Sequence, residues 1–326
     1  MSLLSAASPT PVYDSYWRFA SERQSVLFKR LSGLPPPWTS DQIIANHRFT
    51  NAYRVSDRVS QFLITDVIRN GDQSDREMTF RVLLFKLFNK IETWRFLKDV
   101  FTDVSYASFD RATYSDVLTE LRSAGVSIYS AAYMMPSPQL GESSKHADHL
   151  KLIDIMMSDG FAEKIRATSN LESLYRLILS YPTFGPFLAY QMAIDLNYTD
   201  IVDFDEDEFI VPGPGALDGI SKCFASASNF RPEDIIKEVT ARQEEELRSR
   251  DLQFLKIFDR RLKLIDCQNL FCEISKYSRV RHPEFAGVAN RKKIKQKYDA
   301  DTKTGVDFYS LTLPAKWLAK GDRSCV

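Results

Sequence analysis

The residues YPTFGPFLA (181–189) lie between two helical patterns and predict a tight hairpin that joins two helices. We expect Gly185 to adopt the positive φ that closes such a turn, because glycine has no side chain to oppose it. The second helix starts directly after the turn, so its free N–H groups point outward, where a phosphate can bind. Two interpretations stay open: an ordinary helix-helix turn, or a phosphate-binding hairpin made of Pro182, Phe184, Gly185 and Pro186.

Helical patterns extend from this hairpin over most of the chain. Only 12 of the 326 residues are glycine, which favours helices over a turn-rich β architecture. Residues 80–94 are so apolar that they predict a central buried helix, and apolar residues recur at helical spacing over 46–69. Further helices are expected at 114–124, 147–158, 171–180, 187–196, 232–248 and 251–277. We therefore expect an all-α fold, a helical body of two lobes with a cleft between them.

The two ends of the chain differ from this body. Residues 1–34 are rich in serine and proline, and we expect them to form a flexible arm. Residues 35–282 form the expected body. Residues 283–326 are expected to be an irregular basic tail, which contains the run RKKIKQK (291–297).

Composition excludes several classes of protein. The 43 basic and 43 acidic residues balance, so any attraction to a polyanion must come from a local patch. The four cysteines contain no C-x-x-C pair, which argues against a disulfide framework or a zinc ribbon. No apolar run approaches the roughly 20 residues of a membrane span, and no signal-peptide pattern begins the chain. We expect an intracellular protein, nuclear if its source is a eukaryote, that has no membrane partner.

The acidic run DFDEDE (203–208) follows the second helix of the hairpin. One interpretation is a solvated loop, and another is a magnesium site, because carboxylate oxygens beside a phosphate cradle suit Mg²⁺. The five carboxylates repel one another, so one that turns into a cleft should have a raised pKa. We expect Glu206 to face solvent. The metal requirement stays open.

A second glycine-rich turn, VPGPGALDGISK (211–222), precedes another helix. Alternating glycine and proline can expose backbone N–H groups as an anion-binding nest at a helix N-terminus. In that interpretation the phosphate ligands are Gly213, Gly215, Ala216 and Lys222. The alternative is a turn that only redirects the chain.

Polar residues accompany two of the expected helices. Arg54 and Arg58 lie along one edge of the 46–69 pattern, where they could contact phosphate, whereas Arg48 falls within its apolar stripe and needs a partner. A supporting polar network is expected to include that arginine, the neighbouring Asn51, and three residues on one face of the last long helix, Asp266, Asn269 and Glu273. We favour an ion pair between Arg48 and one of these acids. His146 and His149 lack a third metal ligand and are expected in a surface loop.

The hairpin and the acidic run together resemble the helix-hairpin-helix DNA glycosylases, whose hairpin reads Leu-Pro-Gly-Val/Ile-Gly and whose essential aspartate follows one helix later. Asp205 lies at the matching distance from Gly185, with Asp203 as its rival, so the resemblance implies a catalytic carboxylate there. Thr183 replaces the first glycine of the hairpin. Phe187 stands where base-excising lyases have their Schiff-base lysine, which argues against an amine nucleophile.

A more specific resemblance covers residues 35–282. The segments WT (38–39), RFTNAYRVSDR (48–58), GPGA (213–216) and DCQN (266–269) with Glu273 are similar to the 5-hydroxymethyluracil DNA kinase helical domain, also described as the α-glutamyl/putrescinyl thymine pyrophosphorylase group. The chain has no phosphate-binding P-loop, so we carry over no kinase activity.

The resemblance implies a DNA base hypermodification protein. It would act on a flipped, modified thymine and displace pyrophosphate from 5-pyrophosphorylmethyluracil with a small amine or amino-acid donor. Two alternatives stay open. One is a glycosylase that hydrolyses the N-glycosidic bond with the same aspartate, and the other is a non-catalytic DNA-binding module.

Overall fold

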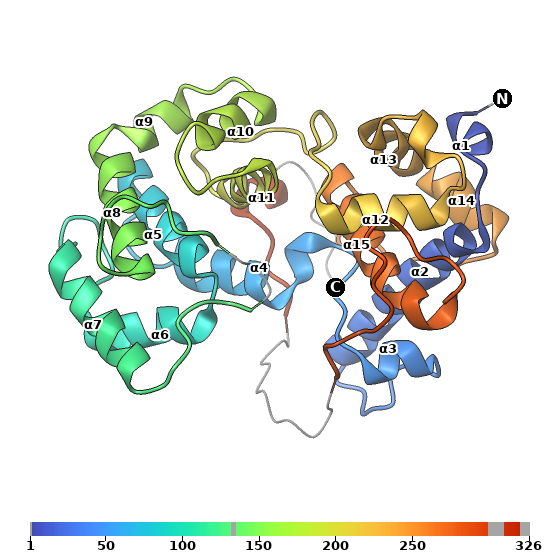
Figure 1. Ribbon diagram of the computed structural model, residues 1–326, viewed down its shortest axis with the longest axis horizontal. Coiled ribbons are helices and arrows are strands. Elements are labelled where there is room, and N and C mark those ends of the chain that lie inside the picture. The colour runs from blue at the N-terminus through green and yellow to red at the C-terminus, as the bar shows by residue number, and fades with distance from the viewer. Residues whose placement is uncertain (1, 132–134, 299–309, 320–326) are drawn as a thin grey trace. The chain divides into compact units, whose positions relative to one another are not determined.

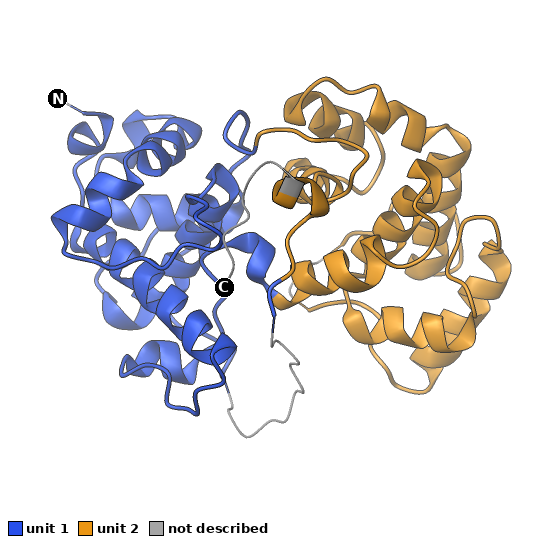
Figure 2. Cartoon of the chain, turned by 180° about the vertical axis from the view of Figure 1, so that it is seen from behind, with its two compact units in different colours: residues 1–57, 206–311, 319–326 blue, residues 58–205, 312–318 orange. Residues whose placement is uncertain are grey.

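The computed structural model describes residues 2–131, 135–298 and 310–319. Within these residues all regular structure is helical, apart from two isolated β-bridges, Pro9 with Phe224 and His47 with Lys297. The expected all-α class is therefore confirmed. The chain divides into two compact units (Figure 2). Unit 1 comprises residues 1–57, 206–311 and 319–326, and unit 2 comprises residues 58–205 and 312–318.

Unit 1 is built around one long helix, α15. Its elements are α1 (Leu3–Ala6), α2 (Pro11–Leu31), α3 (Gln42–Asn46), η1 (Arg54–Ser56), α12 (Pro214–Cys223), η3 (Ala227–Asn229), α13 (Pro232–Ala241), α14 (Gln243–Ser249) and α15 (Leu264–Arg281). Helices α2, α3, α12 and α13 all pack against α15 (Figure 1).

Helix α2 lies where a flexible arm was expected, so that interpretation of residues 1–34 was wrong. Thr10 caps the helix by accepting the N–H of Val12, and a proline occupies its first turn, which is a favoured start. Tyr16 and Trp17 are fully buried, and the Tyr16 ring lies 4.7 Å from that of Phe271. The burial of aromatic residues at helical spacing thus makes this segment a packed helix, although its serine and proline content favoured a flexible arm.

Helices α12 and α15 approach closely because two glycines face the partner helix. A Cβ atom at Gly219 would lie 2.0 Å from the carbonyl oxygen of Phe271, and one at Gly215 would lie 2.9 Å from the Cys272 Sγ. The glycines of this segment therefore have a packing role.

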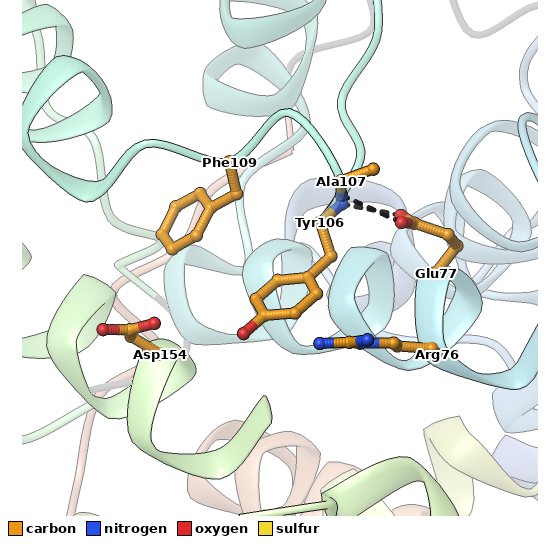
Figure 3. A pocket seen from close by; sticks show the side chains of 6 residues that line it. All are labelled: Arg76, Glu77, Tyr106, Ala107, Phe109 and Asp154. Atoms are coloured by element: carbon orange, nitrogen blue, oxygen red, sulfur yellow. Dashed lines mark hydrogen bonds between the residues drawn. The ribbon is translucent and has the colours of Figure 1, made fainter. Parts of the chain in front are cut away.

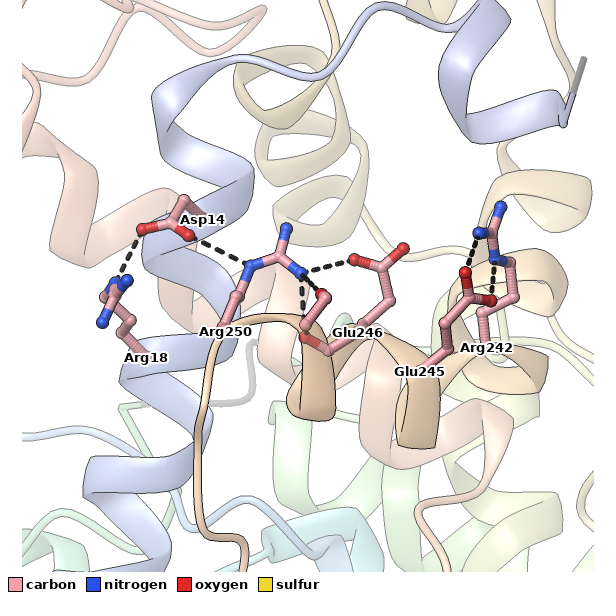
Figure 4. A network of polar contacts seen from close by, with 7 residues as sticks. Asp14, Arg18, Arg242, Glu245, Glu246 and Arg250 are labelled. Atoms are coloured by element: carbon pink, nitrogen blue, oxygen red, sulfur yellow. Dashed lines mark hydrogen bonds and ion pairs between the residues drawn. The ribbon is translucent and has the colours of Figure 1, made fainter.

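Charged residues join α14 to α2 (Figure 4). Asp14 accepts hydrogen bonds from Arg18 at 2.7 Å and from Arg250 at 3.0 Å. Arg250 also pairs with Glu246 at 2.6 Å. The exposed pair of Asp14 with Arg18 contributes about 1 kcal/mol or less, whereas the Arg250–Glu246 pair is largely shielded from solvent.

Unit 2 surrounds helix α5. Its elements are α4 (Arg58–Phe62), the π-helical turn η2 (Leu63–Ile68), α5 (Asp75–Phe88), α6 (Ile91–Val100), α7 (Arg111–Ser123), α8 (Lys145–Ser158), α9 (Phe161–Arg166), α10 (Leu171–Leu179), α11 (Pro186–Leu196) and most of α16 (Ala315–Ala319). Helix α5 packs against η2, α6, α8, α9 and α11 (Figure 1). A buried ion pair, Lys86 with Asp195 at 2.5 Å, joins α5 to α11.

His146 and His149 are both buried on α8, which corrects their expected place in a surface loop. His149 accepts a hydrogen bond from the Tyr129 hydroxyl at 2.7 Å and donates one to the Pro136 carbonyl at 2.8 Å. Burial lowers the pKa of His149 to about 4. This histidine is therefore neutral at physiological pH and serves the packing of unit 2.

Candidate functional site

The hairpin between α10 and α11 exists, but its turn residue differs from the expected one. Gly185 caps α11 with φ −70°, whereas Thr183 adopts the positive φ of 78°. The Thr183 hydroxyl donates a hydrogen bond to the Pro136 carbonyl at 2.7 Å, which ties this strained residue to a neighbouring segment. Glycine was assigned to the turn because it tolerates positive φ most easily, and this assignment was wrong.

Only part of the hairpin is accessible to a ligand. Pro182, Gly185 and Pro186 are exposed, whereas Phe184 is 4% exposed and belongs to the core of unit 2. A phosphate-binding role for Phe184 is therefore restricted to its backbone. Phosphate binding by the other three residues stays a prediction.

The acidic run separates into exposed and buried carboxylates. The backbone of Phe204 exchanges two hydrogen bonds with the Asn197 side chain, at 2.9 and 3.0 Å, and on either side of it Asp203 and Asp205 are exposed. Glu206 is only 4% exposed, so the expectation that it faces solvent was wrong. Burial and the nearby charge of Asp266 raise the pKa of Glu206 to about 7. The raised pKa expected in this run therefore belongs to Glu206.

Glu206 belongs to a cluster within unit 1, the carboxylate cluster, which combines two acids and three cations. Glu206 and Asp266 are the acids, and Arg54, Arg260 and Lys263 are the cations whose charges act on Glu206. Within the described chain the buried Oε1 of Glu206 has no hydrogen-bond donor. A carboxyl group whose pKa lies near neutral pH and that has several cations beside it is typical of active sites.

Asp266 is the better anchored of the two acids. Its carboxylate accepts the backbone N–H of Arg54 at 2.7 Å and that of Lys263 at 2.9 Å. Burial nevertheless raises the pKa of Asp266 to about 6. The Lys263 ammonium pairs with Asp207 at 2.6 Å. Both carboxyls of the cluster thus hold a proton to a higher pH than exposed acids do.

The loop over residues 251–263 supplies Arg260 to this cluster. The sequence pattern predicted a helix here, yet α15 begins only at Leu264. Phe258 and Asp259 both adopt positive φ, at 48° and 55°, which strains non-glycine residues. Strained backbone of this kind is concentrated at functional sites.

The segment from residue 47 to 53 also departs from the expected helix. Two of its N–H groups donate to carboxylates rather than to helical carbonyls: Thr50 to Glu273 at 3.1 Å and Asn51 to Asp57 at 2.8 Å. The Asn51 side chain accepts a hydrogen bond from Arg23 at 2.8 Å. Burial raises the pKa of Asp57 to about 7. Glu273 thus bonds the neighbour of Asn51, whereas Asn51 itself bonds Asp57 and Arg23, so a network that joins Asn51, Asp266 and Glu273 stays a prediction.

The arginines of the sequence pattern occupy different environments. Arg48 is exposed, and within the described residues it forms no ion pair with Asp266 or Glu273, so the favoured pairing was wrong. Arg54 is buried, which leaves little of its side chain for a DNA phosphate. Arg58 is exposed and lies 3.7 Å from Glu92. Asn269 is half-buried on α15.

The glycine-rich turn is explained mainly by packing. Gly213 caps α12, Ala216 is buried, and Gly215 faces α15. Lys222 is 1% exposed, donates to the Ser275 carbonyl at 2.9 Å and pairs with Asp218 at 3.3 Å. Its ammonium is therefore unavailable to a ligand phosphate, which corrects its expected role.

Unit 2 contains a separate pocket that the sequence did not indicate (Figure 3). Its cavity of about 370 Å³ is lined by Arg76, Glu77, Tyr106, Ala107, Phe109 and Asp154. Glu77 fixes one wall by accepting the N–H groups of Tyr106 and Ala107, at 2.6 and 2.9 Å. The Arg76 guanidinium lies 4.6 Å from the centre of the Tyr106 ring. Aromatic rings beside charged groups suit a small planar or cationic ligand.

Two classes of site are not found in the described part of the chain. No three His, Cys, Asp or Glu side chains lie together as metal ligands. No helix there is both long and apolar enough to cross a membrane.

The helical fold agrees with the comparison to known families. Residues 10–287 match the family model described as 5-hmdU DNA kinase, helical domain, and the chain belongs to this family. The matched residues include α2, the carboxylate cluster and the hairpin. The resemblance expected from the sequence motifs is thereby confirmed.

A particular relative is the 5-hmdU DNA kinase of Bacillus phage SP10. It is 28% identical over 288 residues, which cover 82% of this chain and 45% of the relative. The chain thus spans less than half the length of that protein. No solved structure matches the chain.

Proposed function

We propose that this chain modifies a 5-hydroxymethyluracil derivative in DNA. The observation that carries the proposal is the carboxylate cluster, in which Glu206 has a pKa of about 7 among three cations. Family membership over residues 10–287 and the name of the phage relative, a 5-hmdU DNA kinase, support the choice of base.

The proposed reaction displaces pyrophosphate from 5-pyrophosphorylmethyluracil with an amine or amino-acid donor. The donor nitrogen forms a bond to the methylene carbon, and the bond from that carbon to oxygen breaks with its electron pair on pyrophosphate. The Glu206 carboxylate takes the proton that the nitrogen loses, for which a pKa near 7 is well matched. Arg260 and Lys263 would stabilise the negative charge that leaves.

Asp205, with Asp203 as its alternative, remains a second proposal for the catalytic carboxylate. It supports a different reaction, hydrolysis of the N-glycosidic bond at a flipped base. The favouring observation is the hairpin between α10 and α11, which is followed one helix later by these two exposed aspartates. There the carboxylate would stabilise positive charge on the sugar.

Mass spectrometry of nucleosides tests both reactions. Duplex DNA containing thymine, 5-hydroxymethyluracil or 5-pyrophosphorylmethyluracil is incubated with the protein, with and without a primary amine, and then digested. We expect an amine adduct from the pyrophosphorylated base, with Glu206→Gln reducing its yield about 10²-fold. Parallel reactions with Mg²⁺ and with EDTA test the magnesium requirement.

The matched control is Asp205→Asn, which also replaces a carboxylate of the same run. Loss of product in this variant or in Asp203→Asn, with full activity in Glu206→Gln, would transfer the catalytic role to the exposed aspartates. Abasic sites in place of an adduct would identify a glycosylase. If no base is altered while DNA is bound, the chain is a binding module and the proposal is overturned.

A further inference from the structure

The basic run near the C-terminal end is held against unit 1 rather than left loose. We call residues 291–298 the basic strap. Its backbone pairs with the segment after α3: Arg48 donates its N–H to the Gln296 carbonyl at 3.1 Å, and Tyr298 donates to the Asn46 carbonyl at 2.9 Å. An antiparallel β-bridge joins His47 and Lys297 between these two bonds. The strap is thus fixed by its backbone, which leaves its side chains available.

A further contact orients the middle of the strap. The Arg279 guanidinium, on α15, donates a hydrogen bond to the Lys293 carbonyl at 3.2 Å. The strap is therefore connected to the central helix of unit 1 as well as to residues 46–48. Fixing a charged segment in advance lowers the entropy that a binding partner must remove.

The side chains of the strap present concentrated positive charge to solvent. Five basic residues are exposed, Arg291, Lys292, Lys293, Lys295 and Lys297, and the neighbouring Arg48 is exposed as well. Within the described ranges none of these six side chains forms an ion pair with an acid.

Some exposed cations elsewhere in the molecule are, in contrast, paired with acids. Arg18 pairs with Asp14 at 2.7 Å, and Arg176 pairs with Glu172 at 2.6 Å. The contrast matters because the chain as a whole carries no net charge. A positive field near the protein must therefore come from local groups of cations, and the five exposed basic residues within 291–297 are such a group.

We propose that the basic strap and Arg48 form a docking surface for the phosphate backbone of double-stranded DNA. This inference rests on the proposed function, which makes DNA the substrate. Lysines and arginines that contact phosphates position a protein on the duplex and carry no sequence information. The strap would therefore supply affinity and orientation, while the choice of modified base lies elsewhere.

The test measures how DNA binding depends on salt in the full chain. The variant Lys292→Gln, Lys293→Gln, Lys295→Gln removes three exposed charges without altering the backbone pairing. Binding of a fluorescent 20-base-pair duplex is followed by anisotropy across a series of NaCl concentrations. Each lost phosphate contact makes the negative slope of log K against log salt shallower by about 0.9, so we expect the magnitude of the slope to fall by roughly 2 to 3. The affinity ratio between modified and unmodified duplex should not change.

The matched control is Arg18→Gln, Arg176→Gln, Arg231→Gln, which removes three exposed arginines that each face a carboxylate. Its slope should stay close to that of the unmodified protein. An equal decrease in both triple variants would overturn the proposal, because overall charge would then explain the effect. An unchanged slope in the strap variant would overturn it as well. Tighter binding to an RNA duplex or to phosphatidylserine vesicles than to DNA would reject DNA as the partner.

The outcome separates this inference from the proposed function. If the salt slope depends on the strap but nucleoside analysis finds no altered base, the docking surface stands and the catalytic proposal fails. If altered bases form and the strap variant binds as before, the catalytic proposal stands and the docking surface is rejected.

Discussion

Carboxylates of unit 1 take the place of helical hydrogen-bond acceptors. Glu273, Asp57 and Asp266 accept the N–H groups of Thr50, Asn51 and Arg54. The shared helix face of Asp266 and Glu273 predicted a polar network, but the partner expected for them, the Arg48 side chain, was wrong. Side-chain periodicity indicates which residues share a face, and it carries no information on acceptors for backbone N–H groups.

The raised pKa of Glu206 predicts a pH-dependent stability. The folded state holds this proton more tightly than the unfolded state, so stability is lost as the pH rises from 4.5 to about 7. Glu206→Gln removes the ionisation. We expect the variant to gain on the order of 2 kcal/mol in the free energy of unfolding at pH 8 and little at pH 5, measured by urea unfolding.

Glu208→Gln is the control, because it removes one charge from an exposed side chain of the same run. An equal gain at pH 8 in this variant would attribute the effect to the charge of the run rather than to the burial of Glu206.

At the scale of elements, the helices of unit 2 were the most predictable. Expected helices at 114–124, 147–158, 171–180 and 187–196 lie within a few residues of α7, α8, α10 and α11. Errors arose where one residue interrupts a continuous apolar pattern. Asn89, with φ 49°, separates α5 from α6 inside the expected helix 80–94, and α13 ends just before Arg242 within 232–248. Apolar spacing continues across such breaks, so periodicity alone does not reveal them.

The candidate site was less predictable than the helices. Glu206 and Asp205 are neighbours in one charge run, and only the folded chain shows that the first is buried and the second exposed. Nothing in the sequence indicated Arg260 as a site residue, because apolar residues recur at helical spacing over its loop and predict a helix there. The pocket in unit 2 depends on tertiary packing of α5, α8 and the 106–109 segment, which a linear sequence does not display.

The close approach of α12 and α15 gives a prediction for Gly219. A methyl group there meets the Phe271 carbonyl, which belongs to a helix backbone and cannot move aside easily. We expect Gly219→Ala to lower the free energy of unfolding by about 1 to 3 kcal/mol in urea denaturation. In contrast, nothing lies within 4 Å of a Cβ atom at Gly185, so Gly185→Ala should change stability by less than about 1 kcal/mol. Similar values for both variants would contradict the packing role.

At the scale of the whole molecule, the two units should respond oppositely to acid. Unit 1 contains carboxyls whose pKa values are raised, whereas unit 2 contains His149, whose pKa is lowered from 6.5 to about 4. A lowered histidine pKa contributes stability that is present above 6.5 and is lost as the pH falls toward 4. The loss amounts to on the order of 2 to 3 kcal/mol.

Hydrogen exchange with mass spectrometry measures this difference. After correction for intrinsic rates, amides of α8 should lose protection between pH 6.5 and 4, while amides of α15 should gain it. His149→Gln should remove most of the acid effect on α8 and leave α15 unchanged. Parallel trends in both helices would refute the assignment of opposite titrations to the two units.

The division of unit 1 into distant segments has a consequence for synthesis on the ribosome. Helix α2 emerges early, yet its Tyr16 bonds to the carbonyl of Cys267, 251 residues later. At typical translation rates, roughly 12 to 50 seconds pass between the synthesis of α2 and the synthesis of Cys267. During this time the aromatic face of α2 lacks that partner. Unit 2 completes most of its sequence within this interval. We therefore expect chaperones that shield nascent aromatic surface to engage this chain first at α2.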